Sequence, residues 1–192
     1  NWWPAETALE VMVGAILTQN TNWTNVEKAI RNLKKQGLLS VKSLCSIPVT
    51  ELAQAIRPAG YYNIKANRVR NLINFIMDHY DGDLSILLKE KTEILRPGLL
   101  SVKGIGPETA DSILLYAAGR PRFVVDTYTH RILSRHDMAE EQAEYHDIQD
   151  FFMDHLPEDK ALFNEFHALI VQTGKVYCKK KPVCDCCPLE QW

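Results

Sequence analysis

The sequence has no long apolar run and little cysteine, and neither sign of charge dominates it. No stretch of its 192 residues approaches the ~20 apolar residues that a membrane-spanning helix needs, and residues 1–20 lack the basic start and cleavage site of a signal peptide. With 46% hydrophobic and 24% charged residues, the composition excludes a disordered, collagen-like or disulfide-stapled chain. We therefore expect a cytoplasmic protein with a sizeable core and no membrane association.

The charges are unevenly distributed although the formal net charge is only -2. Residues 137–165 contain ten acids and one base. Residues 52–77 contain no acid and four bases, which are Arg57, Lys65, Arg68 and Arg70. The second segment is either a face that binds a polyanion or an ordinary solvated helix face, and the absence of any acid favours the polyanion.

Apolar residues recur with helical spacing almost everywhere, as in Leu9, Val13 and Ile16, and no segment alternates with the period of a strand. The sequence therefore predicts an all-α fold of about nine or ten helices within a single domain, residues 1–192. The predicted helix breaks are Gly37, Pro48, Pro58 to Gly60, Gly82, Pro97-Gly98, Gly104 to Gly106, Gly119 to Pro121, Pro157 and Pro182.

A tight hairpin is predicted at residues 102–106, between a short helix ending near Leu100 and a longer helix over residues 107–117. Gly104 and Gly106 leave the backbone bare, so that amide N–H groups at a helix start can bind a phosphate. Lys103 adds a positive charge. Taken alone, the same pattern also fits a plain turn between helices.

Asp126 follows the apolar run of residues 123–125 and precedes an amphipathic helix. As an N-cap it would stabilise that helix by about 1 kcal/mol, which is sufficient reason for an aspartate there. The alternative is catalytic. A carboxylate kept ionised at a helix N-terminus can stabilise an oxocarbenium ion or activate a water while a base leaves a deoxyribose.

Four of the five cysteines gather near the end of the sequence, at Cys178, Cys184, Cys186 and Cys187, while Cys45 stands alone. In a cytosolic chain such a cluster indicates metal binding rather than disulfides. Thiolates suit iron–sulfur clusters and zinc alike.

Five motifs in one order resemble the helix-hairpin-helix DNA glycosylases of the endonuclease III type, with closest likeness to the 3-methyladenine glycosylase branch. They are Lys103-Gly-Ile-Gly-Pro-Glu-Thr-Ala110, Val125-Asp-Thr127, Leu17-Thr-Gln-Asn-Thr21, Gly60-Tyr-Tyr-Asn-Ile-Lys-Ala66 and the terminal cysteines. The resemblance implies two lobes, approximately 5–120 with the hairpin at 101–118, and 121–192 with the extreme N-terminus. It also implies damaged double-stranded DNA between the lobes, Asp126 as the catalytic carboxylate, and a phosphate at Gly104 and Gly106.

Two positions depart from the endonuclease III pattern. Bifunctional members carry a lysine just before the Thr-Ala of the hairpin helix, where its amine forms a Schiff base with the sugar. Glu108 stands there and cannot form an imine, so we expect a monofunctional enzyme without lyase activity. Glu108 is otherwise explained as a first-turn acid. Tyr128 stands where the pattern usually has His, with no effect that the sequence reveals.

Asn1-Trp-Trp-Pro4 and Trp23 look like the aromatic signature of the 3-methyladenine branch. Electron-rich rings attract a methylated, positively charged purine more strongly than a neutral base. Trp2, Trp3, Pro4 and Trp23 are therefore the predicted base pocket. A core position for the tryptophans is an equal rival, because Trp is mostly buried in any fold.

Gln19 and Tyr61 match positions from which relatives push side chains into the duplex, one filling the gap left by the flipped base and one wedging the opposite strand. Inserted side chains offset part of the cost of extruding a base. With them, the predicted contacts to DNA are Asn20, Asn63, Lys65, Lys103, Gly104 and Gly106.

The spacing of Cys178, Cys184 and Cys187 resembles the start of the family's loop for a [4Fe–4S] cluster. A fourth ligand would follow at position 193, beyond the sequence, or Cys186 would substitute, which its adjacency to Cys187 makes sterically poor. We expect the cluster to be structural, since hydrolysis of a glycosidic bond moves no electrons.

The sequence thus predicts a monomeric base-excision glycosylase, most simply one for alkylated purines and located at the nucleoid if the source is a prokaryote. Two alternatives stay open. One is a bifunctional endonuclease III for oxidised pyrimidines, which Glu108 disfavours. The other is a DNA-binding iron–sulfur module without catalysis, which Asp126 disfavours.

Overall fold

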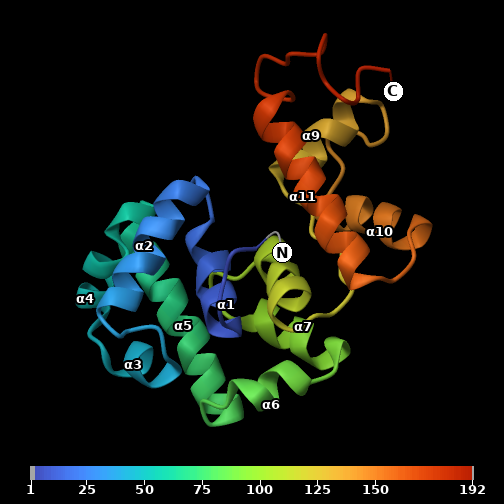
Figure 1. Ribbon diagram of the computed structural model, residues 1–192. Helices are drawn as coiled ribbons and strands as arrows, with labels where there is room; N and C mark the ends of the chain where they lie inside the picture. Colours follow the sequence, from blue (N-terminus) through green and yellow to red (C-terminus); the bar gives the residue numbers. More distant parts are fainter. Residues whose placement is uncertain (1–2, 192) are drawn as a thin grey trace. The chain divides into compact units, whose positions relative to one another are not determined.

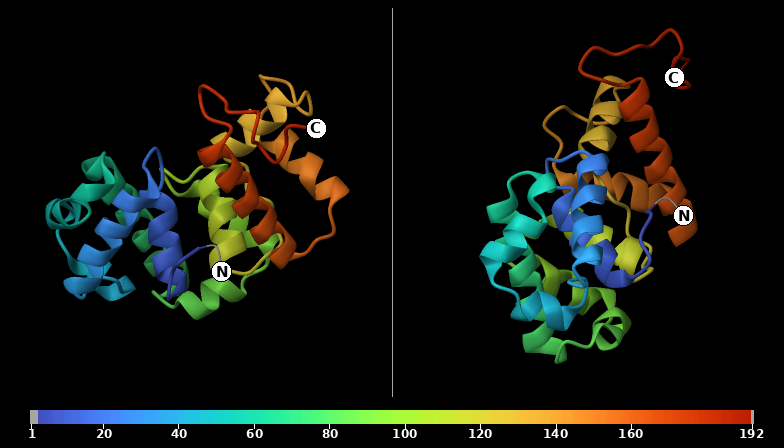
Figure 2. Two further views of the ribbon diagram at one scale, coloured as in Figure 1. Left: turned by 45° about the horizontal axis from the view of Figure 1, so that its top comes forward. Right: turned by 60° about the vertical axis from the view of Figure 1, so that its left-hand side comes forward.

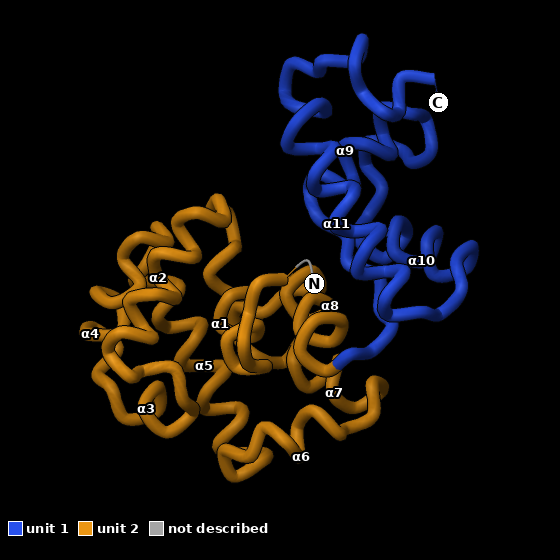
Figure 3. The backbone as a smooth tube through the Cα atoms, viewed as in Figure 1, with its two compact units in different colours: residues 1–2, 119–192 blue, residues 3–118 orange. Residues whose placement is uncertain are grey.

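The computed structural model describes residues 3–191, which divide into two compact units (Figure 3). The first unit in chain order contains Trp3–Ala118 (orange in Figure 3), and the second contains the chain from Gly119 onward (blue in Figure 3). Over residues 3–191 the chain forms helices and no strand, so the predicted all-α class is confirmed. No described helix combines the length and the apolar character needed to cross a bilayer.

The first unit contains eight of the described α-helices (Figure 1). They are α1 (Ala8–Leu17), α2 (Trp23–Lys35), α3 (Val41–Ser46), α4 (Val49–Ala55), α5 (Tyr62–Tyr80), α6 (Leu84–Lys89), α7 (Thr92–Ser101) and α8 (Pro107–Ser112). A 3-10 turn, Arg57–Ala59, precedes α5, and a π-helical segment, Ile113–Ala117, follows α8.

The core of this unit is built around α1, whose residues from Leu9 to Leu17 are all buried. It packs against α2, α5, α8 and the π-helical segment (Figure 1). Its start is fixed by Thr7, whose side chain accepts a hydrogen bond from the backbone of Glu10. The elements that carry the sequence motifs therefore converge on one apolar helix.

The prediction of a helix break at Pro97-Gly98 is wrong, because both residues lie inside α7. Leu95 and Leu99 of this helix are fully buried, and their packing outweighs the hydrogen bond that proline removes. Gly98 has a packing reason, since a Cβ there would come within 3.0 Å of the Phe75 ring on α5.

The second unit contains α9 (Thr127–Arg135), α10 (Tyr145–His155) and α11 (Lys160–Val176). Helices α9 and α11 lie side by side in every view, and the chain beyond α11 forms an irregular loop (Figures 1 and 2). The core is aromatic. Phe123 stacks on Phe152 with ring centroids 3.9 Å apart, and Phe163 meets Phe123 edge to face.

Candidate active site and DNA-binding elements

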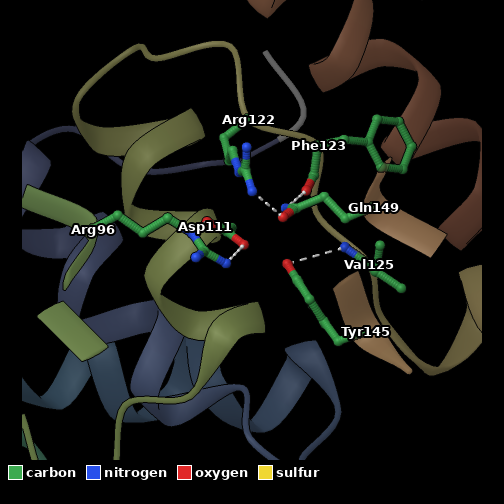
Figure 4. Close-up of polar contacts among 7 residues, drawn as sticks. All are labelled: Arg96, Asp111, Arg122, Phe123, Val125, Tyr145 and Gln149. Atoms are coloured by element: carbon green, nitrogen blue, oxygen red, sulfur yellow. Dashed lines mark hydrogen bonds and ion pairs between the residues drawn. The ribbon is translucent and has the colours of Figure 1, made fainter. Parts of the chain in front are cut away.

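The hairpin between α7 and α8 is held by a bidentate ion pair. Arg96 of α7 donates from Nε and Nη2 to the two carboxylate oxygens of Asp111 on α8, at 2.7 and 3.0 Å (Figure 4). Asp111 is fully buried. Paired hydrogen bonds between guanidinium and carboxylate fix direction as well as distance, so the two helices keep one geometry around the turn.

The two hairpin glycines differ, because the structure requires glycine at position 104 and leaves open space at position 106. Gly104 has a φ of +100°, and a Cβ there would lie 2.4 Å from Cγ of Arg68. Gly106 precedes α8, which has no side-chain cap, and nothing lies within 4 Å of the position a Cβ would take. The backbone at the start of α8 is therefore open to an external anion, as the phosphate hypothesis requires.

The two loops predicted to enter DNA have unusual backbones. Asn20 has a φ of 52° and Tyr61 a φ of 44°, both in the left-handed region that residues other than glycine rarely occupy. Tyr61 is 70% exposed although it is a large aromatic residue. An exposed ring held in a strained backbone is typical of a functional position.

Gln19 lies in the turn that follows α1 and is bound to the hairpin. Its Nε2 donates to the carbonyl oxygen of Gly104 at 3.1 Å and to Oγ1 of Thr109 at 2.9 Å. Its Oε1 accepts a hydrogen bond from Arg68. The predicted gap-filling residue and the predicted phosphate-binding turn are thus joined directly.

One of the four bases of the basic segment faces inward, which corrects the prediction that Lys65 contacts DNA. Lys65 is only 1% exposed and donates to three oxygen atoms of the protein. Arg70 donates to the carbonyl oxygens of Cys45 and Ile47. Of the other three bases, Arg57 is exposed, and Arg68 and Arg70 are half-buried. The Lys65 ammonium is therefore not available to a DNA phosphate in this structure.

The remaining predicted contacts of this unit lie on the surface. Asn63 of α5 and Lys103 of the hairpin are both exposed. Asn71, also on α5, donates to the carbonyl oxygen of Lys103 at 2.9 Å, which anchors the hairpin to that helix. Glu108 is exposed in the first turn of α8.

Asp126 is the N-cap of α9, as one of the two interpretations of the sequence predicts. Its Oδ1 accepts hydrogen bonds from the backbone of Tyr128 at 2.9 Å, the backbone of Thr129 at 2.8 Å and the Thr129 hydroxyl at 2.9 Å. All three donors bind the same oxygen. Capping therefore uses Oδ1 and leaves Oδ2 for another role.

His167 of α11 lies next to that second oxygen, with Nε2 at 3.6 Å from Oδ2 of Asp126. Burial favours the neutral form of Asp126, but His167 and the Thr129 donors outweigh it and hold the pKa of the Asp126 carboxyl below its ordinary value. The carboxylate is therefore ionised at neutral pH. No sequence motif indicated His167.

The segment that delivers Asp126 to the start of α9 is fixed by α10. The buried Gln149 accepts a hydrogen bond from Arg122 at 2.6 Å and donates to the carbonyl oxygen of Phe123 at 2.5 Å (Figure 4). The Tyr145 hydroxyl accepts from the backbone of Val125 at 3.4 Å. Backbone groups that no helix or sheet pairs are satisfied here by side chains.

Tyr128 locks α9 to α11. A Cβ on Gly174 of α11 would lie 2.4 Å from Cδ1 of Tyr128, so the ring occupies the space that the glycine leaves. Arg131 lies over the Tyr128 ring, with Cζ 5.0 Å from its centroid. This gives the unusual tyrosine a structural role, which the sequence did not reveal.

Trp3 and Trp23 line a pocket of about 200 Å³ that is open to solvent. Trp3 and Trp23 meet edge to face with centroids 5.3 Å apart, and Tyr116 lies 5.0 Å from Trp3. Trp3 also lies over Gly14, where a Cβ would come 3.3 Å from the indole. Both tryptophans are partly buried, and Pro4 also lines the pocket, whereas Trp2 falls outside the described residues.

The charged groups around this pocket are partly paired with one another. Lys34 forms ion pairs with Glu6 at 3.0 Å and with Glu10 at 2.9 Å. Glu27 is exposed and accepts a hydrogen bond from Nε1 of Trp23 at 2.9 Å. Trp23 is thus oriented by a carboxylate at the pocket wall.

The cysteine loop begins at the end of α11 and is held by α9. Arg135 donates to Sγ of the buried Cys178 at 3.2 Å, and Arg131 donates to its carbonyl oxygen at 2.7 Å. Cys184 and Cys186 are exposed. Within residues 3–191, no group of three or more His, Cys, Asp or Glu side chains is arranged to bind a metal ion. The described cysteines are not arranged as the ligands of a cluster. The [4Fe–4S] cluster therefore stays a prediction.

Comparison with known proteins decides the family. The profile of the HhH-GPD superfamily of base excision DNA repair proteins matches residues 13–158. The chain belongs to this superfamily. This HhH-GPD protein is 50% identical over 193 residues to a protein of Methanocaldococcus jannaschii whose assignment as a DNA repair glycosylase is itself provisional. That match covers 100% of this chain and 88% of the relative. The chain is thus a base-excision DNA repair glycosylase.

Solved structures agree with this assignment. The H. pylori 3-methyladenine DNA glycosylase MagIII, bound to 1,N6-ethenoadenine, superposes with a TM-score of 0.78 at 30% identity and covers 91% of this chain and 88% of its own. An endonuclease III trapped as a covalent intermediate with DNA superposes with a TM-score of 0.85 at 23% identity, covering 98% of this chain and 84% of its own. The expected endonuclease III fold is confirmed.

Proposed function

We propose that this HhH-GPD glycosylase removes alkylated purines from duplex DNA by hydrolysis and does not cleave the strand. The pocket at Trp3 and Trp23 is the observation that supports alkylated purines as the substrate class. Indole faces attract cations, and a purine methylated on a ring nitrogen is a cation, whereas an oxidised pyrimidine is neutral. The likeness to a 3-methyladenine glycosylase that binds 1,N6-ethenoadenine supports the same substrate class.

Hydrolysis needs a negative charge near the sugar, and Asp126 is suited to supply it. The glycosidic bond between C1′ and the base nitrogen breaks, its electron pair leaves with the base, and a water oxygen bonds to C1′. A cationic base departs as a neutral molecule, so it needs no general acid. Oδ2 of Asp126 can stabilise the positive charge that develops on the sugar and accept the proton from the water.

The proposal that the enzyme does not cleave the strand rests on the residue type at position 108, which is Glu108 and not a lysine. Strand cleavage by this family type needs an amine that attacks C1′, and a carboxylate cannot form the resulting imine. We assign Glu108 no step in catalysis. The cysteine loop has no step either, since hydrolysis transfers no electrons.

We propose that DNA contacts the first unit at its exposed hairpin and loops. The open backbone at Gly106 and the ammonium of Lys103 would bind a phosphate, while Tyr61, Gln19 and Asn20 would enter the duplex. Extrusion of a base costs a few kcal/mol of stacking, which inserted side chains partly offset.

The test is a panel of duplexes that each contain one lesion: 7-methylguanine, 1,N6-ethenoadenine, an oxidised pyrimidine or an abasic site. Released base and strand nicks are measured separately. We expect release of 7-methylguanine and no nick before alkali treatment. Nicks at the oxidised pyrimidine or the abasic site would instead establish the bifunctional alternative.

A further inference from the structure

The buried ammonium of Lys65 joins three segments that are far apart in the sequence. Its Nζ donates to the carbonyl oxygen of Leu17 at 2.8 Å, to Oγ1 of Thr21 at 2.6 Å and to the carbonyl oxygen of Ala59 at 2.8 Å. An ammonium has three N–H donors, and all three are used. The Thr21 hydroxyl also donates to the same Ala59 oxygen at 2.5 Å, which closes the network.

These anchor points enclose both strained residues. Asn20 lies between Leu17 and Thr21, and Tyr61 follows Ala59 by two residues. The backbone N–H of Lys65 donates to the carbonyl oxygen of Tyr61 at 3.0 Å, so one residue is bonded to both loops. A left-handed conformation of a residue with a side chain persists only where its surroundings hold it.

The charge is retained at this site despite its burial. Burial, and to a smaller extent the charge of Arg68, lowers the pKa of Lys65 to about 8. The side chain therefore remains mostly protonated at pH 7. A buried cation without acidic partners is costly unless its hydrogen bonds are satisfied, and here carbonyl and hydroxyl oxygens satisfy them.

We propose that Lys65 is a positioning residue for base extrusion, which sets the loop of Asn20 and the loop of Tyr61 as one rigid wedge. This rests on the proposed function, because it assumes that these loops enter duplex DNA. Two side chains inserted at fixed separation can open a duplex, whereas loops that move independently lose part of that binding energy as they become ordered. Lys65 thus acts on DNA through the loops and not through a phosphate.

Base extrusion can be tested separately from cleavage of the glycosidic bond by changing the substrate. A lesion in single-stranded DNA is already unpaired and needs little extrusion, whereas the same lesion in a duplex needs all of it. Lys65→Met keeps an unbranched stem and removes the three donors. We expect single-turnover base release from duplex DNA to fall about tenfold or more and release from single-stranded DNA to change much less.

Lys28→Met is the matched control, because it makes the same substitution at an exposed lysine of α2 to which no role in binding or catalysis is assigned, and it should change neither extrusion nor base release. Thr21→Val is a milder variant of the network, which keeps the shape of the side chain and removes one acceptor of Lys65. It should show the same selective loss to a smaller degree, even if Lys65→Met does not fold. Melting temperatures are recorded for all three variants.

Extrusion is also measured directly, by the fluorescence of 2-aminopurine placed beside the lesion, which rises when stacking is lost. Reduced extrusion by Lys65→Met or Thr21→Val, with binding retained, is the expected result. Equal losses on duplex and single-stranded DNA, or unchanged extrusion, would overturn the role of Lys65 alone. A wild-type protein that neither extrudes nor releases a base would overturn the proposed function, and the wedge with it.

Discussion

Replacement of Asp126 separates its two roles, because the structure assigns them to different oxygen atoms. Asp126→Asn keeps a carbonyl oxygen that can accept all three bonds now made to Oδ1, so the free energy of unfolding should change by less than about 1 kcal/mol. Asp126→Ala removes the cap and should cost about 1–2 kcal/mol. For a chain of this length that lowers the melting temperature by about 2–8 °C.

Activity should not follow stability in this pair of variants. Both lose the negative charge of Oδ2, so base release should fall about 10²–10⁴-fold in each, the range typical of a lost acid or base group. Single-turnover release of 7-methylguanine, binding to lesion DNA and thermal melting are measured on the same preparations. Near-normal turnover by Asp126→Asn would show that the chemistry belongs to another residue.

Three further predictions concern the remaining site residues. Borohydride should trap no adduct between the wild-type protein and DNA, while Glu108→Lys introduces the amine that can form one; a wild-type adduct would refute the hydrolytic mechanism. Trp23→Leu should weaken excision of charged methylpurines by about 1–2 kcal/mol and of neutral bases by less, whereas equal losses with a lower melting temperature would assign Trp23 to the core. His167→Gln should raise the pKa of Asp126, because burial then acts with less opposition, so the acid limb of base release should move to higher pH. The stability that the ionised carboxylate contributes should likewise be lost at a higher pH as the solution is acidified, and coincident pH profiles for the two proteins would refute this role.

Much of the fold could be predicted because local chemistry determines where its helices end. Gly37 follows α2, Pro48 precedes α4 and Gly82 separates α5 from α6, each at a predicted break. Pro97-Gly98 fails as a break for a reason outside its neighbourhood. Burial of the flanking leucines and the approach of Phe75 are tertiary contacts, which the local sequence does not contain.

Site residues that belong to a sequence motif could be predicted. Residues that reach the site only through tertiary packing could not. The cap at Asp126 follows from residue type and position, whereas its contact with His167 joins residues that are 41 positions apart (167 minus 126) on different helices. The basic segment shows a second limit. Its composition is the same whether Lys65 points inward or outward, and only the loops at Leu17 and Ala59 decide that it points inward.

The fit of Tyr128 into the gap at Gly174 affects how variants of the cysteine loop should be read. The end of α11 at Val176 lies about 13 Å along the helix from His167, Cys178 follows two residues later, and Arg131 donates to both Gly174 and Cys178. The end of α11 that carries the loop and the turn that faces Asp126 therefore belong to one interlocked pair of helices. Damage to the loop can then slow base release by tilting α11 away from α9, without the loop ever touching DNA.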